Sequence, residues 1–262
     1  MTRRLPALFV SHGSPMVAIE NEDWGRRLRE FGASLARPLA AVVVSAHFEA
    51  PPPLRITSSK APETIHDFSG FPPELHRIQY VARGDPDLAE RIRNLFGRSG
   101  MSATLDPRRG LDHGAWVPLR FLFPRADVPV VEVSLPVPRR PQDAFKIGAV
   151  LSPLRNDNVL LLGSGGMVHN LRRIDAADDP SRVATWARAF DDWMAARLEA
   201  MDLPAILDYR EQAPSADSAA PSSDHFDPIF VVLGSAVAGE RVHTLHEGFR
   251  YGSLSMRSFA VG

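Results

Sequence analysis

The sequence of 262 residues contains no cysteine. Disulfide bonds, thiolate nucleophiles, iron–sulfur clusters and thiolate zinc sites are therefore all excluded. A metal ion bound by this chain must be held by histidine and carboxylate side chains. The nine histidines of the sequence are the first candidates for such a site.

The sequence also lacks a long apolar run and an excess of either charge. No run of about 18 apolar residues occurs, and the N-terminal apolar stretch is short, is interrupted by proline and meets polar Ser11 and His12. The 30 Lys and Arg residues nearly balance the 31 Asp and Glu residues. We therefore expect a cytoplasmic protein with no nucleic-acid or membrane partner. No heptad pattern occurs, so a monomer and a homodimer both stay open.

Short apolar runs alternate with helical patterns along the chain. This alternation predicts an α/β fold with one domain over residues 1–262 and a mainly parallel central sheet with helices on both faces. We found no internal repeat and no domain boundary. The predicted strands are Ala7–Val10, Ala40–Val44, Val128–Val133, Val159–Leu162 and Ile229–Leu233.

Two segments have a helical pattern, and one segment is of low complexity. Asp87–Phe96 places its apolar residues on one face, and a stronger stripe follows the start signal at 179–181. In that second helix we expect Trp186 and Trp193 to face the core. The stretch Ala213–Ser223 predicts a mobile loop over a site.

Three histidines follow three different predicted strands. His12 and His47 come two and three residues after their apolar runs, and His169 lies in a glycine-rich turn after Val159–Leu162. Ligands of a parallel sheet bind beyond the carboxyl ends of its strands, where loops converge. Three imidazoles at that edge can hold a divalent ion and leave positions open for water or substrate.

Other residues compete to complete this site. His225 follows the low-complexity stretch, and the carboxylates Asp224, Asp227 and Glu49 are alternatives to it. His113 lies in a loop flanked by glycines, where it either faces a substrate or forms a hydrogen bond to its neighbour in the turn.

Several common catalytic motifs are absent. The sequence has no G-x-S-x-G, no P-loop and no H-E-x-x-H, and Val168 occupies the third glycine position of a dinucleotide fingerprint. We expect His66 and His76 to be hydrogen-bonded loop residues, and His243 and His246 to lie at the surface.

A set of short motifs from residue 12 to residue 256 resembles the DOPA-type extradiol ring-cleavage dioxygenases of the class III extradiol superfamily. Their order and spacing over nearly the whole chain make the resemblance specific. The motifs are His12–Met16, Ser45–His47, Thr64–Phe68, Gly70–Pro72, Leu111–Leu119, Gly163–Gly165, Val168–Leu171, Asp224–Phe226 and Gly252–Met256.

The resemblance implies an enzyme that opens a catechol ring beside its two hydroxyls and inserts both atoms of O₂. It implies one divalent metal per chain, with His12, His47 and His225 as ligands. His169 resembles the acid/base histidine and is also a candidate fourth ligand. His113 resembles the residue that steers substrate and oxygen.

Two departures from the usual pattern bear on the metal and the substrate. Non-haem iron oxygenases commonly use two histidines and one carboxylate, whereas an all-histidine set suits zinc. Zinc(II) therefore fits a purified sample, while iron(II) is expected for activity because zinc has no accessible redox change. Phe48 stands where the family often has Trp, which predicts a substrate shape different from DOPA.

Two other functions agree with the same residues. One is a zinc hydrolase in which His169 serves as the base. The other is a metal-binding or catechol-binding protein without activity. Oxygen uptake during catechol turnover separates the dioxygenase from both.

Overall fold

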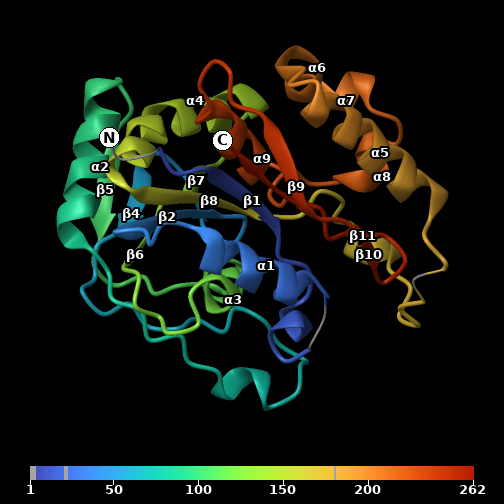
Figure 1. Cartoon of the computed structure of the whole chain (residues 1–262), viewed down its shortest axis with the longest axis horizontal. Helices are drawn as coiled ribbons and strands as arrows, with labels where there is room; N and C mark the ends of the chain where they lie inside the picture. Colours follow the sequence, from blue (N-terminus) through green and yellow to red (C-terminus); the bar gives the residue numbers. More distant parts are fainter. Residues whose placement is uncertain (1–3, 21–22, 180) are drawn as a thin grey trace.

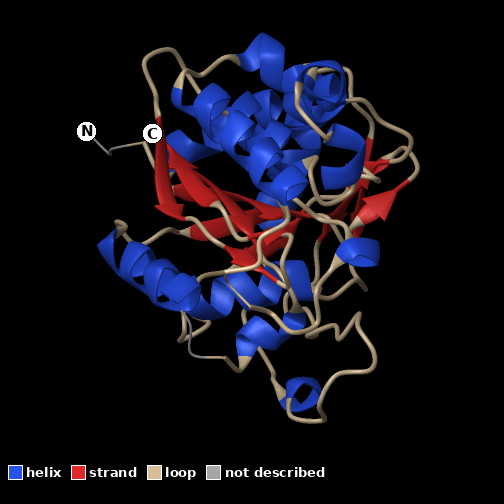
Figure 2. Cartoon of the chain, turned by 90° about the vertical axis from the view of Figure 1, so that its right-hand side faces the viewer, coloured by secondary structure: helices blue, strands red, loops and turns tan. Residues whose placement is uncertain are grey.

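The computed structural model describes residues 4–20, 23–179 and 181–262. Its centre is a twisted sheet of six strands with helices on both faces (Figures 1 and 2). The strand order is β6 (Val130–Glu132), β2 (Ala40–Ser45), β8 (Val159–Gly165), β1 (Ala7–Ser11), β12 (Ser258–Val261) and β9 (Val242–His246).

The first four strands of this order run parallel, and the last two pairings are antiparallel. Three short two-stranded sheets accompany the central one. They are β3 (Glu49–Ala50) with β7 (Leu135–Pro136), β4 (Leu54–Thr57) with β5 (Ala103–Asp106), and β10 (Phe249–Arg250) with β11 (Leu254–Ser255). The predicted α/β fold with a mainly parallel sheet is therefore confirmed.

Alternating side chains of the strands feed two separate cores. In β1, Ala7 and Phe9 join one buried cluster, and Leu8 and Val10 join the other. Strand residues point alternately to opposite faces, so an apolar run without polar breaks is buried on both sides. This explains why the parallel strands are almost continuously apolar.

The helices divide between the two faces. One face is covered by α1 (Asp23–Ser34) and α3 (His113–Leu122). The other face carries the larger helical layer, which is visible above the sheet in Figure 2. It consists of α2 (Pro86–Arg98), α4 (Pro141–Leu151), α5 (Thr185–Glu199), α6 (Leu203–Leu207), α7 (Tyr209–Gln212), α8 (Ala216–Ala219) and α9 (Pro228–Gly234). None of the helices in the described residues is long and apolar enough to cross a bilayer.

The apolar run Ile229–Leu233 was predicted as a strand, and this prediction is wrong. The run lies inside α9, with Pro228 at its first position and Gly234 at its end. Every residue of α9 is buried, because the helix packs between the sheet and α4. A short helix that is apolar all round has the same composition as a buried strand, so periodicity does not separate them.

One prediction about the C-terminal half also needs correction. The stretch predicted as a mobile loop contains α8, and Ala216 and Ala219 of that helix are buried. As predicted, Trp186 and Trp193 face the core: both are half-buried and pack against it. The helix that carries them begins at Thr185, and Pro180 of its predicted start signal lies outside the described residues.

Candidate active site

The five histidines singled out from the sequence meet at the carboxyl edge of the parallel strands. His12 follows β1, His47 follows β2, His169 follows β8, His113 begins α3 and His225 precedes α9. The ring centroid of His12 lies 5.0 Å from that of His47, 5.2 Å from that of His113 and 5.3 Å from that of His225. His169 stacks on His225 with centroids 3.5 Å apart.

The register of the strands accounts for this convergence. Ser11 of β1 pairs with Gly165 of β8, and Ser45 of β2 pairs with Ser164. The three strands therefore end at the same level, and the residue after each of them emerges at one edge. The His12 amide continues the ladder by donating to the Gly165 carbonyl over 2.9 Å.

Two of the imidazoles are each held at Nδ1 by a hydrogen bond to a neighbouring side chain. Nδ1 of His12 forms a 2.9 Å hydrogen bond with Ser164 Oγ. Nδ1 of His225 donates to the carboxylate of Asp224 over 2.8 Å. A partner on one ring nitrogen sets the orientation of the ring and leaves Nε2 for a metal or substrate.

Asp67 does the same for two further histidines. Its Oδ1 accepts hydrogen bonds of 2.9 Å from both the backbone amide and Nδ1 of His113. Its Oδ2 lies 3.4 Å from Nδ1 of His47. Burial disfavours the charged form of Asp67, but the hydrogen bonds and charge of His113 outweigh burial and lower the pKa of Asp67 to about 2.

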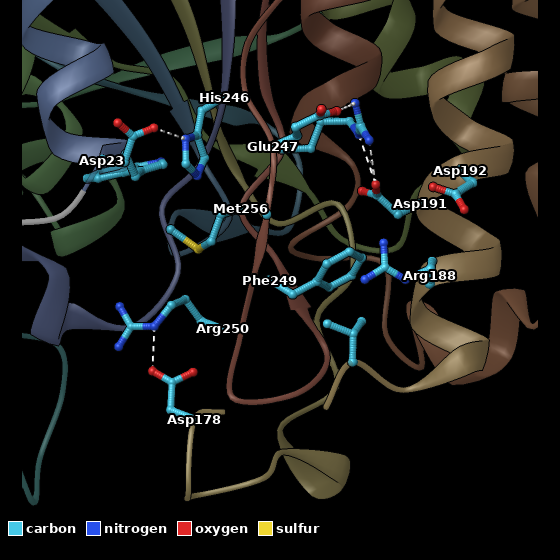
Figure 3. A pocket seen from close by; sticks show the side chains of 14 residues that line it. Asp23, Asp178, Arg188, Asp191, Asp192, His246, Glu247, Phe249, Arg250 and Met256 are labelled. Carbon is cyan, nitrogen blue, oxygen red and sulfur yellow. Dashed lines mark hydrogen bonds and ion pairs between the residues drawn. The ribbon is translucent and has the colours of Figure 1, made fainter. Parts of the chain in front are cut away.

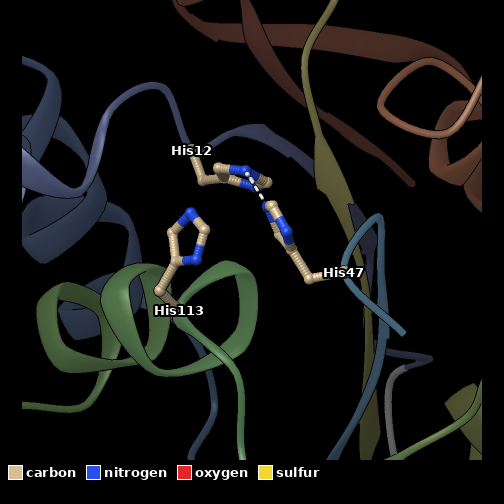
Figure 4. A group of neighbouring side chains, drawn as sticks. All are labelled: His12, His47 and His113. Atoms are coloured by element: carbon tan, nitrogen blue, oxygen red, sulfur yellow. Dashed lines mark hydrogen bonds between the residues drawn. The ribbon is translucent and has the colours of Figure 1, made fainter. Parts of the chain in front are cut away.

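The Nε2 atoms of His12 and His47 lie 3.1 Å apart (Figure 4). Two nitrogen ligands of a tetrahedral metal, each bonded at about 2.0–2.1 Å, are roughly 3.3 Å apart. The spacing therefore fits a shared metal ion. Among the described residues, His113 joins these two in a group whose ligand atoms all lie within 4.8 Å of one another.

The ring of His225 also lies close to those of His12 and His47. Its ring centroid is 4.8 Å from that of His47. The structure thus brings together His12 and His47, which were both predicted as ligands, and leaves His113 and His225 as neighbours on either side of them.

Burial keeps the central imidazoles neutral. It lowers the pKa of His12 well below its ordinary value, with a further contribution from the neighbouring histidines. Burial and the charges of His113 and His225 lower the pKa of His47 to about 2, and burial and His225 lower the pKa of His169 to about 3. A neutral imidazole is the form that binds metals and accepts protons.

A buried polar network supports His47 from behind. Ser45 Oγ accepts from the His47 amide over 3.2 Å and donates to Asp112 over 2.7 Å. Arg109 donates to the His47 carbonyl and to the Asp112 carboxylate over 3.0 and 2.8 Å. Gly114 allows this packing, because a Cβ there would overlap Ser45 Oγ and lie 3.1 Å from the His47 ring.

Some sequence-based interpretations change in the structure. The side chain of Asp112 caps α3 by accepting from the Ala115 amide, and His113 Nδ1 donates its hydrogen bond to Asp67 and not to Asp112. Phe48 is buried beneath the guanidinium of Arg109, 3.9 Å from its ring centroid. A cavity of about 420 Å³ opens onto the histidines, and Phe48 is not among the described residues that line it. The presence of Phe in place of Trp therefore does not shape the cavity wall directly.

The alternative carboxylates are engaged elsewhere. Glu49 and Asp227 both bind Arg139, and neither lies among the residues that line the cavity. The prediction that His66 is a hydrogen-bonded loop residue is confirmed, because its Nε2 donates to the Ile78 carbonyl over 2.9 Å. The role of Asp67 was missed, because only the folded chain brings a loop carboxylate to two distant histidines.

The cavity of about 420 Å³ opens onto the histidines. His47, His113, His169 and His225 form one side of it. The other walls consist mainly of apolar side chains, namely Pro15, Phe68, Phe71, Leu171, Ile174 and Leu254. This volume lies within the range of about 300–1,000 Å³ that is typical of small-molecule sites.

A larger cavity of about 700 Å³ lies elsewhere, and none of the five histidines lines it (Figure 3). Several of the charged side chains that line it form ion pairs with one another. Asp23 faces His246 at 3.5 Å, and Arg250 binds Asp178. We therefore place the chemistry in the smaller cavity, where the polar groups converge on open space.

Comparison with known proteins identifies the family of this chain. The family described as "Catalytic LigB subunit of aromatic ring-opening dioxygenase" matches residues 6–262. The "4,5-DOPA dioxygenase extradiol" of Beta vulgaris is 36% identical over 255 residues, covering 96% of this chain and 94% of that protein. The protein of the same name from Escherichia coli K12 is 36% identical over 263 residues, covering 99% and 95%.

A solved structure shares the fold. The crystal structure of an uncharacterized protein from Escherichia coli K12 superposes with a TM-score of 0.85 at 32% identity, covering 99% of this chain and all of that one. The fold, the histidine site and these similarities define an extradiol aromatic ring-opening dioxygenase of class III. The chain belongs to the family of the catalytic LigB subunit of aromatic ring-opening dioxygenases.

Proposed function

We propose that this ring-opening dioxygenase acts on a catechol, inserts both atoms of O₂ and depends on a divalent metal. The observation that carries the proposal is the 3.1 Å approach of Nε2 of His12 to Nε2 of His47, in a place where Ser164 and Asp67 occupy or approach the opposite ring nitrogens. The names of the relatives, which specify DOPA, support a catechol substrate.

We assign His12 and His47 to the metal, with His225 as the third ligand. The family resemblance favours His225, and the Asp224 carboxylate supports it, since such partners strengthen metal-bound histidines. Donor distances alone favour His113 in the third position. The metal content of His225→Ala and of His113→Ala shows which histidine is the third ligand, because only removal of a ligand lowers the metal content strongly.

His169 is the acid/base residue in this proposal. A bound divalent metal lowers the pKa of the catechol hydroxyls and, if it is iron, supplies the redox chemistry that oxygen requires. His169 lines the cavity, so its ring nitrogen can accept the second hydroxyl proton and later return it. His113, whose Nδ1 donates to Asp67, presents Nε2 to the cavity, where it can accept a hydrogen bond that orients the substrate.

We also propose that residues 1–262 act as one catalytic domain. The histidines come from both halves of the chain, and β12 pairs with β1 across the full sequence. A fragment from either half would lack part of the site.

The test is oxygen consumption by metal-free protein that has been reloaded anaerobically with Fe(II) or Zn(II). Each form receives a panel of catechols that includes DOPA, and absorbance is followed for a yellow ring-opened product. Oxygen uptake and colour with iron alone support the proposal. Absence of uptake with every catechol, from protein shown to hold iron, contradicts it and favours the hydrolase or binding-protein alternatives.

A further inference from the structure

The walls of the active-site cavity carry little charge. Among the described residues that line it, none is Asp, Glu, Lys or Arg. Apart from the histidines, the polar side chains on its surface are those of Ser14 and Tyr251, both uncharged at neutral pH. A charged substituent on the substrate would therefore lose water without gaining an ionic partner.

The mouth of the cavity is apolar as well. Leu171 and Ile174 keep 60% and 42% of their surface exposed, although both line the cavity. Large apolar side chains exposed around a pocket typically mark a surface that a ligand covers. Phe68 and Phe71 stand edge to face, with centroids 5.4 Å apart, and extend the same apolar wall.

The guanidinium groups of Arg173 and Arg250, which lie close to the lining residues in sequence, are bound by other side chains. The guanidinium of Arg173 lies 4.5 Å from the ring centroid of Trp186 and donates to Ser218 Oγ over 3.0 Å. Arg250 binds Glu20 and Asp178. Arg172 is exposed and does not line the cavity. A carboxylate on the substrate thus meets no cation at the cavity wall.

We propose that the preferred catechol of this enzyme carries an uncharged, apolar substituent, which the cavity holds against Phe68, Phe71, Leu171 and Ile174. This inference rests on the proposed function, because it assumes that the catechol ring binds at the histidines. It departs from DOPA, whose substituent carries both an ammonium and a carboxylate group.

The test compares four catechols that differ at ring position 4. They are 4-propylcatechol, dopamine, 3-(3,4-dihydroxyphenyl)propionate and DOPA, which are neutral, cationic, anionic and zwitterionic. With the iron-loaded enzyme, we expect kcat/KM for 4-propylcatechol to exceed each of the other values by about tenfold or more. We expect no turnover by the zinc-loaded enzyme, because zinc has no accessible redox change. Calorimetry on that form should give the lowest Kd for 4-propylcatechol.

Leu171→Arg places a cation at the mouth. It should raise kcat/KM for the propionate relative to 4-propylcatechol by about tenfold. The matched control is Leu39→Arg, since Leu39 is 69% exposed and precedes β2 at the opposite edge of the sheet. This control should leave the ratio unchanged.

The possible failures are distinguishable. Preference of the wild-type enzyme for DOPA or the propionate, or an equal effect of Leu171→Arg on all four compounds, would overturn the inference and leave the proposed function intact. Cleavage of none of them would contradict the proposed function. In that case the order of Kd in the zinc form still decides whether the cavity prefers the apolar substituent.

Discussion

At the scale of single residues, the histidines of the site differ in position, and we therefore predict different effects when each is replaced. His12 is buried, and its Nε2 lies 3.1 Å from Nε2 of His47. His169 stacks on His225 and lines the cavity. We predict that His169→Ala keeps most of the metal and lowers turnover by about 10²- to 10⁴-fold. His12→Ala and His47→Ala should lose both metal and turnover.

Metal content and turnover measured on the same samples decide this prediction. Retained metal with lost turnover in His169→Ala identifies a proton-transfer role. Loss of metal from that variant would instead place His169 among the ligands.

Asp67 connects His47 and His113, so its charge should matter for the metal. We predict that Asp67→Asn weakens metal binding by about 10- to 100-fold, because the ring nitrogens lose their anionic partner. Competition with a chelator measures the affinity. Asp127→Asn is the control, since that carboxylate binds Arg37 and Arg125 away from the cavity. Equal affinities in the two variants would argue against the role of Asp67.

The sequence was enough to predict which histidines meet, but not what fixes them. His12, His47 and His169 each follow a strand, and parallel strands end at one edge, so their proximity follows from topology. The partner of His113 was not predictable, because Asp67 and the adjacent Asp112 are equally suitable by chemistry. Only the path of the loop containing Asp67 decides between them.

At the scale of secondary-structure elements, α4 and α9 approach closely through two glycines. A Cβ at Gly148 would overlap the carbonyl oxygen of Val231, and a Cβ at Gly234 would overlap that of Phe145. We predict that Gly148→Ala lowers the free energy of unfolding by about 1–3 kcal/mol, because the two helices must separate. Denaturant titration measures this change.

Gly97 of α2 offers the matched control. It lies within a helix, and in the described residues no atom beyond its chain neighbours and its own helix backbone stands within 4 Å of a Cβ built there. Gly97→Ala should raise the free energy of unfolding by about 0.5–1 kcal/mol through its effect on backbone entropy. A similar loss of stability in both variants would show that close packing of α4 and α9 is not the cause.

The same pair of helices shows where prediction from sequence stops. The parallel strands and α2 were predicted because their patterns extend over enough residues and carry start or stop signals. The residues of α9 are buried on all sides, so its pattern has no polar face to reveal a helix. Strand β12 is four residues long, and its place beside β1 depends on contacts distant in sequence.

At the scale of the whole molecule, Arg155 joins distant parts of the chain. It is fully buried, donates to the carbonyls of Leu5, Ser235 and Val261, and binds the carboxylate of Glu240. We predict that Arg155→Met lowers the free energy of unfolding by about 3–5 kcal/mol, because the Leu5 and Val261 carbonyls lose this donor and Glu240 loses one of its two arginine partners. Thermal and denaturant unfolding measure the loss.

Arg155→Lys distinguishes charge from geometry. Lysine keeps the charge but presents a single compact ammonium, so it cannot reach all of these acceptors at once. We expect it to restore only a small part of the lost stability. Full recovery by lysine would mean that charge alone accounts for the effect.

The position of β12 also bears on the order in which the protein is made. Strand β12 lies between β1 and β9, and the amide of Ser11, which precedes His12, donates to Ser258 Oγ, 247 residues further along the chain. A ribosome therefore releases β1 long before its neighbour exists, and one edge of that strand stays unpaired during most of translation. Pairings this distant in sequence close slowly. The nascent chain can therefore complete the sheet around β1, which ends just before His12, only after nearly all of its residues have been synthesised.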